Sequence, residues 1–222
     1  MTKLSLSALA LIFVSSSVMA STETSFTYGG IYKSLKTAQK TEFSQLSLNF
    51  FLKETGTTNI CPTTRVYLSD GESSYDLSVT KLGKLLLPLD KKLKQDHAAI
   101  TLVTDKPVTC HLAMEIAVVD YELEQINPKK TGQWLLQFQA MYEKLAGWPG
   151  KYFMPEIIGL KFHLAQAERG GGVYHNDGTT TILAEPSKAT FIIPVDVLSS
   201  FEDTGSLEFG AAVLKVTPIL EK

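Results

Sequence analysis

Two histidines and one aspartate in the second half of the chain could hold a metal ion. His175 and Asp177 follow a glycine run at residues 170–172, and His163 lies in the apolar segment before that run. Imidazole and carboxylate groups bind zinc, and bound zinc can activate water for hydrolysis. The alternative is a hairpin turn, because Asn-Asp-Gly favours the left-handed conformations that tight turns require. The spacing is not that of a metal cage, so we favour the turn. A metal-dependent or carboxylate-based hydrolase that uses His163, His175 and Asp177 is the alternative.

Two aspartates suggest a second kind of chemistry. Asp90 ends the phrase LLLPLD, and Asp196 ends the similar phrase FIIPVD. A pair of carboxylates can perform acid–base catalysis. We favour turn formation instead, since an aspartate at a strand end accepts hydrogen bonds from nearby backbone N–H groups. We therefore assign no catalytic residue and expect no cofactor.

An aromatic cluster is the best candidate for contact with a partner. Trp148, Tyr152 and Phe153 lie in the segment GWPGKYFMPE, which should connect a helix to a strand. If exposed, these rings would form a binding patch for an envelope protein or a cell-wall component. Aromatic residues at such joints are more often buried, so we predict that they pack the helix onto the sheet.

The two cysteines, Cys61 and Cys110, are 49 positions apart. Two thiols in an exported chain usually pair, and this spacing is not that of a C-x-x-C redox motif. We predict a structural disulfide. Export itself is indicated by residues 1–20, where Lys3 precedes an apolar stretch and Ala20 follows small residues at an expected cleavage site.

The expected signal peptide and the ordinary globular composition together favour a soluble protein in the periplasm. The apolar stretch near the N-terminus is too short to span a bilayer, and we expect no transmembrane segment after cleavage. The formal net charge is −2, without a concentrated block of basic residues. Nucleic-acid binding usually requires a strongly positive face, so we expect no nucleic-acid partner.

Hydrophobic periodicity predicts an α+β fold that is mainly antiparallel β. One helix is expected at residues 132–146, with Thr131 as N-cap and Gly147 just after its end. A short helical stripe is expected near Tyr28. The other apolar segments alternate like strands, and Asp70-Gly71 predicts a hairpin turn.

The two halves of the chain show the same order of features. Each has a helical stripe, an alternating strand, an Asp-Gly turn and then the LLLPLD or FIIPVD phrase. This series predicts an internal repeat. We place a signal peptide at residues 1–20, one helix-plus-sheet unit at residues 21–125 and a related unit at residues 126–222. One β-sandwich with two helices packed on it is the alternative architecture.

Several of these phrases carry a family resemblance. They are the pattern around Tyr28, LLLPLDKKLKQ, VTCHLAM and FIIPVDVL, together with the cysteine pair. They resemble an uncharacterised "domain of unknown function" family exported by Gram-negative bacteria. The resemblance implies a location in the cell envelope and brings no activity. The sequence thus favours an exported, non-enzymatic binding or structural module.

Overall fold

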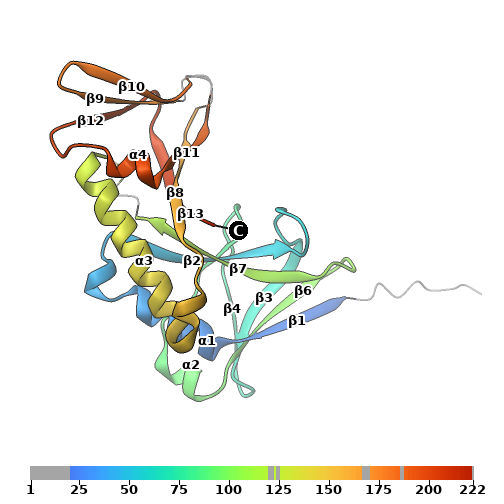
Figure 1. Cartoon of the computed structure of the whole chain (residues 1–222). Helices are drawn as coiled ribbons and strands as arrows, with labels where there is room; N and C mark the ends of the chain where they lie inside the picture. The colour runs from blue at the N-terminus through green and yellow to red at the C-terminus, as the bar shows by residue number, and fades with distance from the viewer. Residues whose placement is uncertain (1–20, 120–122, 124–125, 167–170, 186–187, 222) are drawn as a thin grey trace, which may run out of the picture.

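The computed structural model describes residues 21–119, 123, 126–166, 171–185 and 188–221 (Figure 1). The expected signal peptide, residues 1–20, lies outside these ranges. The fold is α+β, and its strands pair antiparallel, as predicted. Within the described ranges, no helix has both the length and the apolar character needed to cross a membrane.

The first half contains two sheets, two short α-helices and a 3₁₀ helix. In the described residues, one sheet has the strand order β5-β2-β7 and the other β1-β6-β3-β4. The elements are β1 (Thr22–Thr27), α1 (Tyr28–Ala38), η1 (Thr41–Phe43), β2 (Leu46–Glu54), β3 (Thr63–Ser69), β4 (Ser74–Asp76), β5 (Lys84–Leu85), α2 (Lys91–Gln95), β6 (Ala99–Thr104) and β7 (Cys110–Val118).

The second half begins with the longest described helix and also contains two sheets. Their strand orders are β11-β8-β13 and β10-β9-β12. The elements are α3 (Pro128–Gly150), η3 (Lys151–Phe153), β8 (Ile157–Leu164), β9 (Gly172–Asn176), β10 (Thr179–Ala184), β11 (Thr190–Pro194), α4 (Val195–Ser199), β12 (Ser206–Phe209) and β13 (Val213–Leu220).

The two halves have corresponding strand orders. β5-β2-β7 corresponds to β11-β8-β13, and β4-β3-β6 corresponds to β10-β9-β12; β1 is an addition in the first half. The register agrees as well, because Phe50 lies opposite Leu85 in the first half and Phe162 lies opposite Phe191 in the second. Leu85 and Phe191 are the first residues of LLLPLD and FIIPVD. The repeated phrase therefore occupies the same place beside the central strand of each half.

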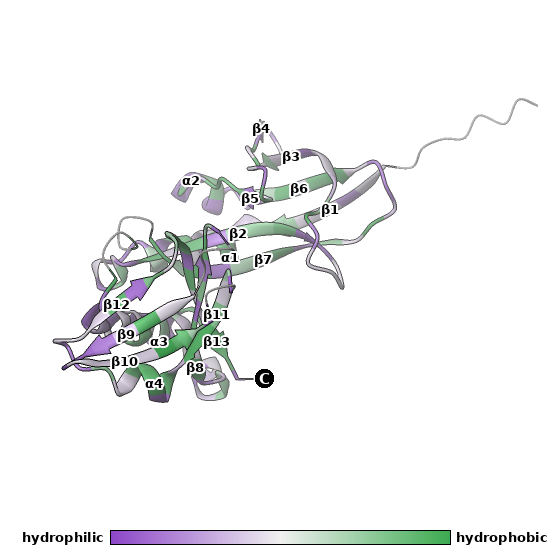
Figure 2. Cartoon of the chain, turned by 90° about the horizontal axis from the view of Figure 1, so that it is seen from above, coloured by the Kyte–Doolittle hydropathy of each residue, from purple (hydrophilic) through white to green (hydrophobic). Residues whose placement is uncertain are grey.

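One continuous hydrophobic core runs through both halves. α1 packs on β2, whereas α3 packs on both β2 and β8. The sheet β10-β9-β12 lies at one end of the molecule and β1-β6-β3-β4 at the other, with β2, β7, β8 and β13 between them (Figures 1 and 2). The helices thus cover one face of the two central sheets. The domain boundary between residues 125 and 126 remains a prediction.

The long helix begins earlier than predicted. Asn127 is the N-cap, and its side chain accepts a hydrogen bond from the Lys130 backbone N–H at 3.0 Å. Thr131 is not the cap: it is buried inside the helix, and its hydroxyl donates to the Pro128 carbonyl. The regular helix stops where expected, because Gly147 adopts φ 65°, a conformation that glycine accepts readily.

The phrase LLLPLD forms less strand than expected. Only Leu85 belongs to β5, and Pro88 follows beyond the strand end. The Tyr28 hydroxyl donates to the Pro88 carbonyl and accepts from the Asp90 backbone N–H, which ties the phrase to α1. The Asp90 carboxylate accepts from the Lys92 backbone N–H at 2.7 Å and caps α2. This is the local role predicted for Asp90.

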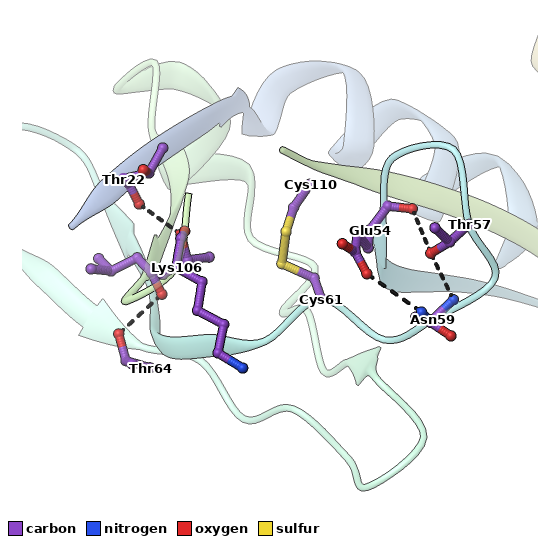
Figure 3. The surroundings of a disulfide bond; sticks show 10 residues. Thr22, Glu54, Thr57, Asn59, Cys61, Thr64, Lys106 and Cys110 are labelled. Carbon is purple, nitrogen blue, oxygen red and sulfur yellow. Dashed lines mark hydrogen bonds between the residues drawn. A yellow bond between two sulfur atoms is a disulfide. The ribbon is translucent and has the colours of Figure 1, made fainter. Parts of the chain in front are cut away.

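The predicted disulfide between Cys61 and Cys110 is present (Figure 3). Cys61 precedes β3 in one sheet, and Cys110 is the first residue of β7 in the other. Both side chains are buried. The bond therefore fastens the two sheets of the first half to each other.

Candidate functional site

The uncovered face of the central sheets contains a groove. Along β2 the side chains alternate: Leu48 and Phe50 are buried beneath the helices, whereas Asn49 and Phe51 point to the opposite face. The groove occupies about 1000 Å³ on this opposite face. It extends from β2 and β7 of the first half to β8 and β13 of the second.

Small side chains on the sheet surface leave space for the groove. In the ladder between β2 and β7, Ser47 lies opposite Ala117 and Phe51 lies opposite Ala113. Directly opposite residues share one face of a sheet. One member of each pair is alanine, so space remains beside Ser47 and Phe51 that a longer side chain would fill.

The first wall of the groove is a tight turn between β4 and β5, residues 80–84. The Gly83 N–H donates to the Thr80 carbonyl at 2.9 Å, and the Thr80 N–H donates to the Lys84 carbonyl at 2.8 Å. Gly83 has φ 80°, and a Cβ atom there would lie 2.9 Å from Ile60. The turn is thereby fixed in place, and it holds Leu82 at the wall with 74% of its surface exposed.

The second wall comes from β8 and β13. It contributes His163, Leu214 and Lys215. The Lys215 ammonium lies 2.9 Å from a Glu115 carboxylate oxygen on β7, so an ion pair joins the two halves at the groove. β7 and β13 lie beside each other, although each belongs to its own sheet.

Positive charge dominates the groove lining. Lys53, Lys81 and Lys84 line it, and none has an ion-pair partner in the described part of the chain. Glu115 is the acidic residue in the lining, and Lys215 pairs with it. The local charge is therefore opposite in sign to the formal net charge of −2 for the whole chain.

The surroundings of His163 favour its neutral form. Burial lowers the pKa of His163, and the charges of Lys215 and Lys161 lower it further, while Glu115 acts in the opposite direction. Its Nδ1 lies 3.4 Å from the Thr190 hydroxyl. These contacts describe a polar group held in place at the rim of the groove.

The residues predicted as metal ligands are not brought together. His163 is on β8, whereas His175 is on β9 and Asp177 is in the turn after it, in another sheet. His175 lies 3.1 Å from the Thr180 hydroxyl and 3.5 Å from a carboxylate oxygen of Glu208. In the part of the chain that the structure describes, no three His, Cys, Asp or Glu residues form a metal-binding group. The favoured hairpin interpretation agrees with Asp177, which has φ 44° between β9 and β10.

The predicted burial of the aromatic cluster is wrong. Trp148 is 81% exposed, Tyr152 is 69% exposed and Phe153 is 83% exposed. The cause is the departure from helical geometry at Gly147 and Trp148, which directs the chain away from the core before η3. The rings form an exposed aromatic segment, and the Lys151 ammonium lies 5.0 Å from the Tyr152 ring centroid.

Sequence reasoning missed the groove. Strand alternation identifies Asn49, Phe51 and Lys53 as one face of β2, and Ala113 and Ala117 as one face of β7. The pattern does not say that β2 and β7 pair, or that β13 lies beside them. The weak signal available was the pair of outward-facing alanines on a strand, where solvent-facing residues are usually larger and polar.

A comparison with known families identifies the chain's class. The model of a family described as a protein of unknown function, DUF2987, matches residues 20–164. The match covers more than half of the chain, and this protein belongs to that family. The match includes LLLPLD and both cysteines, and it ends before FIIPVDVL. No curated protein and no solved structure matches the chain.

Proposed function

We propose that this protein is an exported, non-enzymatic binding module and that the groove is its ligand site. The observation that carries this proposal is an open hollow of about 1000 Å³ in which Leu82 and Leu214 remain exposed. Ligand sites are typically preformed hollows with apolar walls and a few polar groups. The groove has this composition.

The polar groups in the groove favour binding over catalysis. The Ser47 hydroxyl donates to the Ala117 carbonyl and accepts from the Asn49 side chain. His163 lies beside Thr190, and Glu115 pairs with Lys215. Nucleophilic catalysis requires a nucleophile within hydrogen-bond reach of a base. The serine and the histidine of this groove have other partners.

Two features support export to the periplasm. Residues 1–20 have the composition of a signal peptide, and the bond between Cys61 and Cys110 suits an oxidising compartment. The mass of the protein recovered from the periplasm tests this: cleavage after Ala20 is expected, and a full-length cytoplasmic product would contradict it.

The groove itself is tested with a neutral apolar fluorescent probe, N-phenyl-1-naphthylamine. We expect its fluorescence to rise on binding to the wild-type protein and the rise to be lost in Leu82→Ser/Leu214→Ser. Leu136→Ser is the matched control, because Leu136 is also 74% exposed but lies on α3, outside the groove. No binding to the wild type, or equal binding to both variants, would contradict the proposal.

The exposed aromatic segment supports a second binding surface. Trp148, Tyr152 and Phe153 present rings to solvent within six residues of chain. Exposed aromatic residues are a common anchor for partners, and rings can stack on sugar faces. We propose contact with a cell-wall component here. Co-sedimentation with isolated peptidoglycan should fall in Trp148→Ala/Phe153→Ala and persist in Leu136→Ser.

A further inference from the structure

Three of the lysines that line the groove lie on β2, on β5 and in the turn before β5. Lys84 lies directly opposite Phe51 in the ladder between β2 and β5, so both side chains are on the same face. Lys53 is two positions further along β2, and its ammonium lies 6.0 Å from the Phe51 ring centroid. Lys81 belongs to the adjacent turn and also lines the groove. Three lysine residues are thus placed at the same end of the groove.

Apolar side chains continue from this end towards the second half of the molecule. Leu82 on the turn and Leu214 on β13 are exposed lining residues. Ala113 and Ala117 form the floor between them. A ligand in the groove would therefore meet positive charge at one end and apolar surface along its length.

His163 on β8 is the second-half counterpart of Phe51 on β2, and the charges beside these two residues differ. Phe51 follows Phe50 on β2, and His163 follows Phe162 on β8, where Phe50 and Phe162 occupy the same register in the two halves. Both Phe51 and His163 line the groove. Beside Phe51 the lysines have no acidic partner in the described residues, whereas beside His163 the charge of Lys215 is balanced by Glu115. Among the lining residues, the lysines without an acidic partner in the described chain therefore belong to the first half.

We propose that the groove binds a single anionic amphiphile: an acyl or alkyl chain with a phosphate head group, taken up as a free monomer. Lys53, Lys81 and Lys84 hold the head group, and Leu82 and Leu214 cover the chain. Charge-assisted hydrogen bonds from ammonium groups to phosphate oxygens are stronger than neutral ones, which gives selectivity for the anion. This inference rests on the proposed function of the groove.

Hydrogen bonds order the turn at residues 80–84 and the Lys53 side chain before any ligand binds. The Thr80 hydroxyl accepts from the Lys84 N–H at 3.1 Å, in addition to the two backbone bonds across the turn. The Lys53 ammonium donates to the Thr58 carbonyl at 3.0 Å. Groups that are ordered before binding lose less conformational entropy when the ligand arrives.

The test is displacement of N-phenyl-1-naphthylamine by amphiphiles that differ in head-group charge. Decyl phosphate should displace the probe at about tenfold lower concentration than decyltrimethylammonium, because a favourable ionic contact replaces a repulsive one. Inorganic phosphate alone should not displace it. Added salt should weaken the binding of decyl phosphate. All amphiphiles are used below their micelle-forming concentrations.

Variants assign the selectivity to the three lysines. In Lys53→Gln/Lys81→Gln/Lys84→Gln, the affinity for decyl phosphate should fall about tenfold or more, while the neutral probe still binds. Lys33→Gln/Lys36→Gln/Lys91→Gln makes the same change in charge outside the groove and should leave the affinity unchanged. Equal displacement by both amphiphiles, or an unchanged affinity in the groove variant, overturns this inference alone. Failure of the neutral probe to bind the wild type overturns the proposed function and this inference with it.

Discussion

The Lys215 ammonium of β13 lies 2.9 Å from a carboxylate oxygen of Glu115 on β7 and connects the two halves of the chain where their central sheets meet. Both side chains are about one-third exposed. The pair lines the groove and supplies two of the charges that act on the pKa of His163. The contact therefore bears on both the stability of the junction and the electrostatics of the site.

A double-mutant cycle with Glu115→Gln and Lys215→Gln should give a coupling free energy of up to about 1 kcal/mol, the upper range for exposed pairs. Chemical denaturation of the four proteins measures it. Arg65 and Asp76 form the comparison pair, at 2.7 Å but with exposed fractions of 52% and 71%. If the coupling free energy of Arg65 and Asp76 is as large as that of Glu115 and Lys215, partial burial does not strengthen the Glu115–Lys215 ion pair.

The pKa of His163 should respond in opposite directions to changes in its two charged neighbours. Lys215→Met removes a positive charge and should raise the pKa, whereas Glu115→Gln removes a negative charge and should lower it further. An NMR titration of the His163 ring protons measures both shifts. Shifts of the same sign in both variants would contradict the arrangement of charges at the groove.

The lowered pKa of His163 also makes stability depend on pH. The folded protein binds the proton less tightly than the unfolded chain, whose histidine has the usual pKa of 6.5. The free energy of unfolding should therefore decrease as the pH falls from 6.5 towards the lowered value. Denaturation at several pH values should show this slope in the wild type and a smaller slope in His163→Gln. An unchanged slope in the variant would assign the effect to other groups.

Tyr28→Phe should destabilise the protein by about 1–3 kcal/mol. The hydroxyl donates to the Pro88 carbonyl and accepts from the Asp90 N–H, and its removal leaves both groups without this partner. Thermal or urea denaturation measures the loss. Tyr32→Phe, on the same helix, is the control and should cost less. Equal losses would indicate that the hydroxyl of Tyr28 contributes no more than general packing.

Removing the disulfide with Cys61→Ser/Cys110→Ser should lower the free energy of unfolding by about 2–4 kcal/mol. The bond closes a separation of 49 residues and fastens two sheets of the first half together. Urea denaturation of the variant, and of the wild type with and without reductant, measures this. A reductant effect that also appears in the variant would indicate that the disulfide is not its source.

Trp148→Ala/Phe153→Ala should change stability by about 0.5 kcal/mol or less, because exposed side chains contribute little to packing. Phe138→Ala is the contrasting variant: Phe138 is fully buried on α3 and its truncation should cost about 3–5 kcal/mol. Circular dichroism during heating compares the two. If the double variant unfolds, the two rings contribute to the hydrophobic core, as the sequence first suggested.

Local sequence signals predicted the elements of this protein well. The alternation around Phe50 predicted β2, and Asp70-Gly71 predicted the hairpin of β3 and β4, where the Asp70 carboxylate accepts from the Glu72 and Ser73 N–H groups. The order of features also predicted that Leu85 and Phe191 hold similar positions in the two halves. These features depend on short-range backbone preferences and side-chain periodicity, which the sequence displays directly.

Two local predictions failed at the two ends of the long helix. Thr131 looks like a cap from its neighbours, but Asn127 starts the helix one turn earlier and Thr131 is buried by tertiary packing. Trp148 and Phe153 look like core residues by type, yet the chain leaves the helix axis at Gly147 and carries them into solvent. Residue type alone does not give the direction of a connector.

The sequence by itself determined the fold class, the pairing of Cys61 with Cys110 and the correspondence between the two halves, because each is encoded in residue type and order along the chain. The candidate site was decided only by the tertiary structure. Lys84, Ala113 and Lys215 belong to three strands that are distant in sequence, and the groove exists because β5 and β7 flank β2 while β13 lies beside β7. Strand pairing and sheet packing are long-range choices, made by the shared core, and no local pattern specifies them.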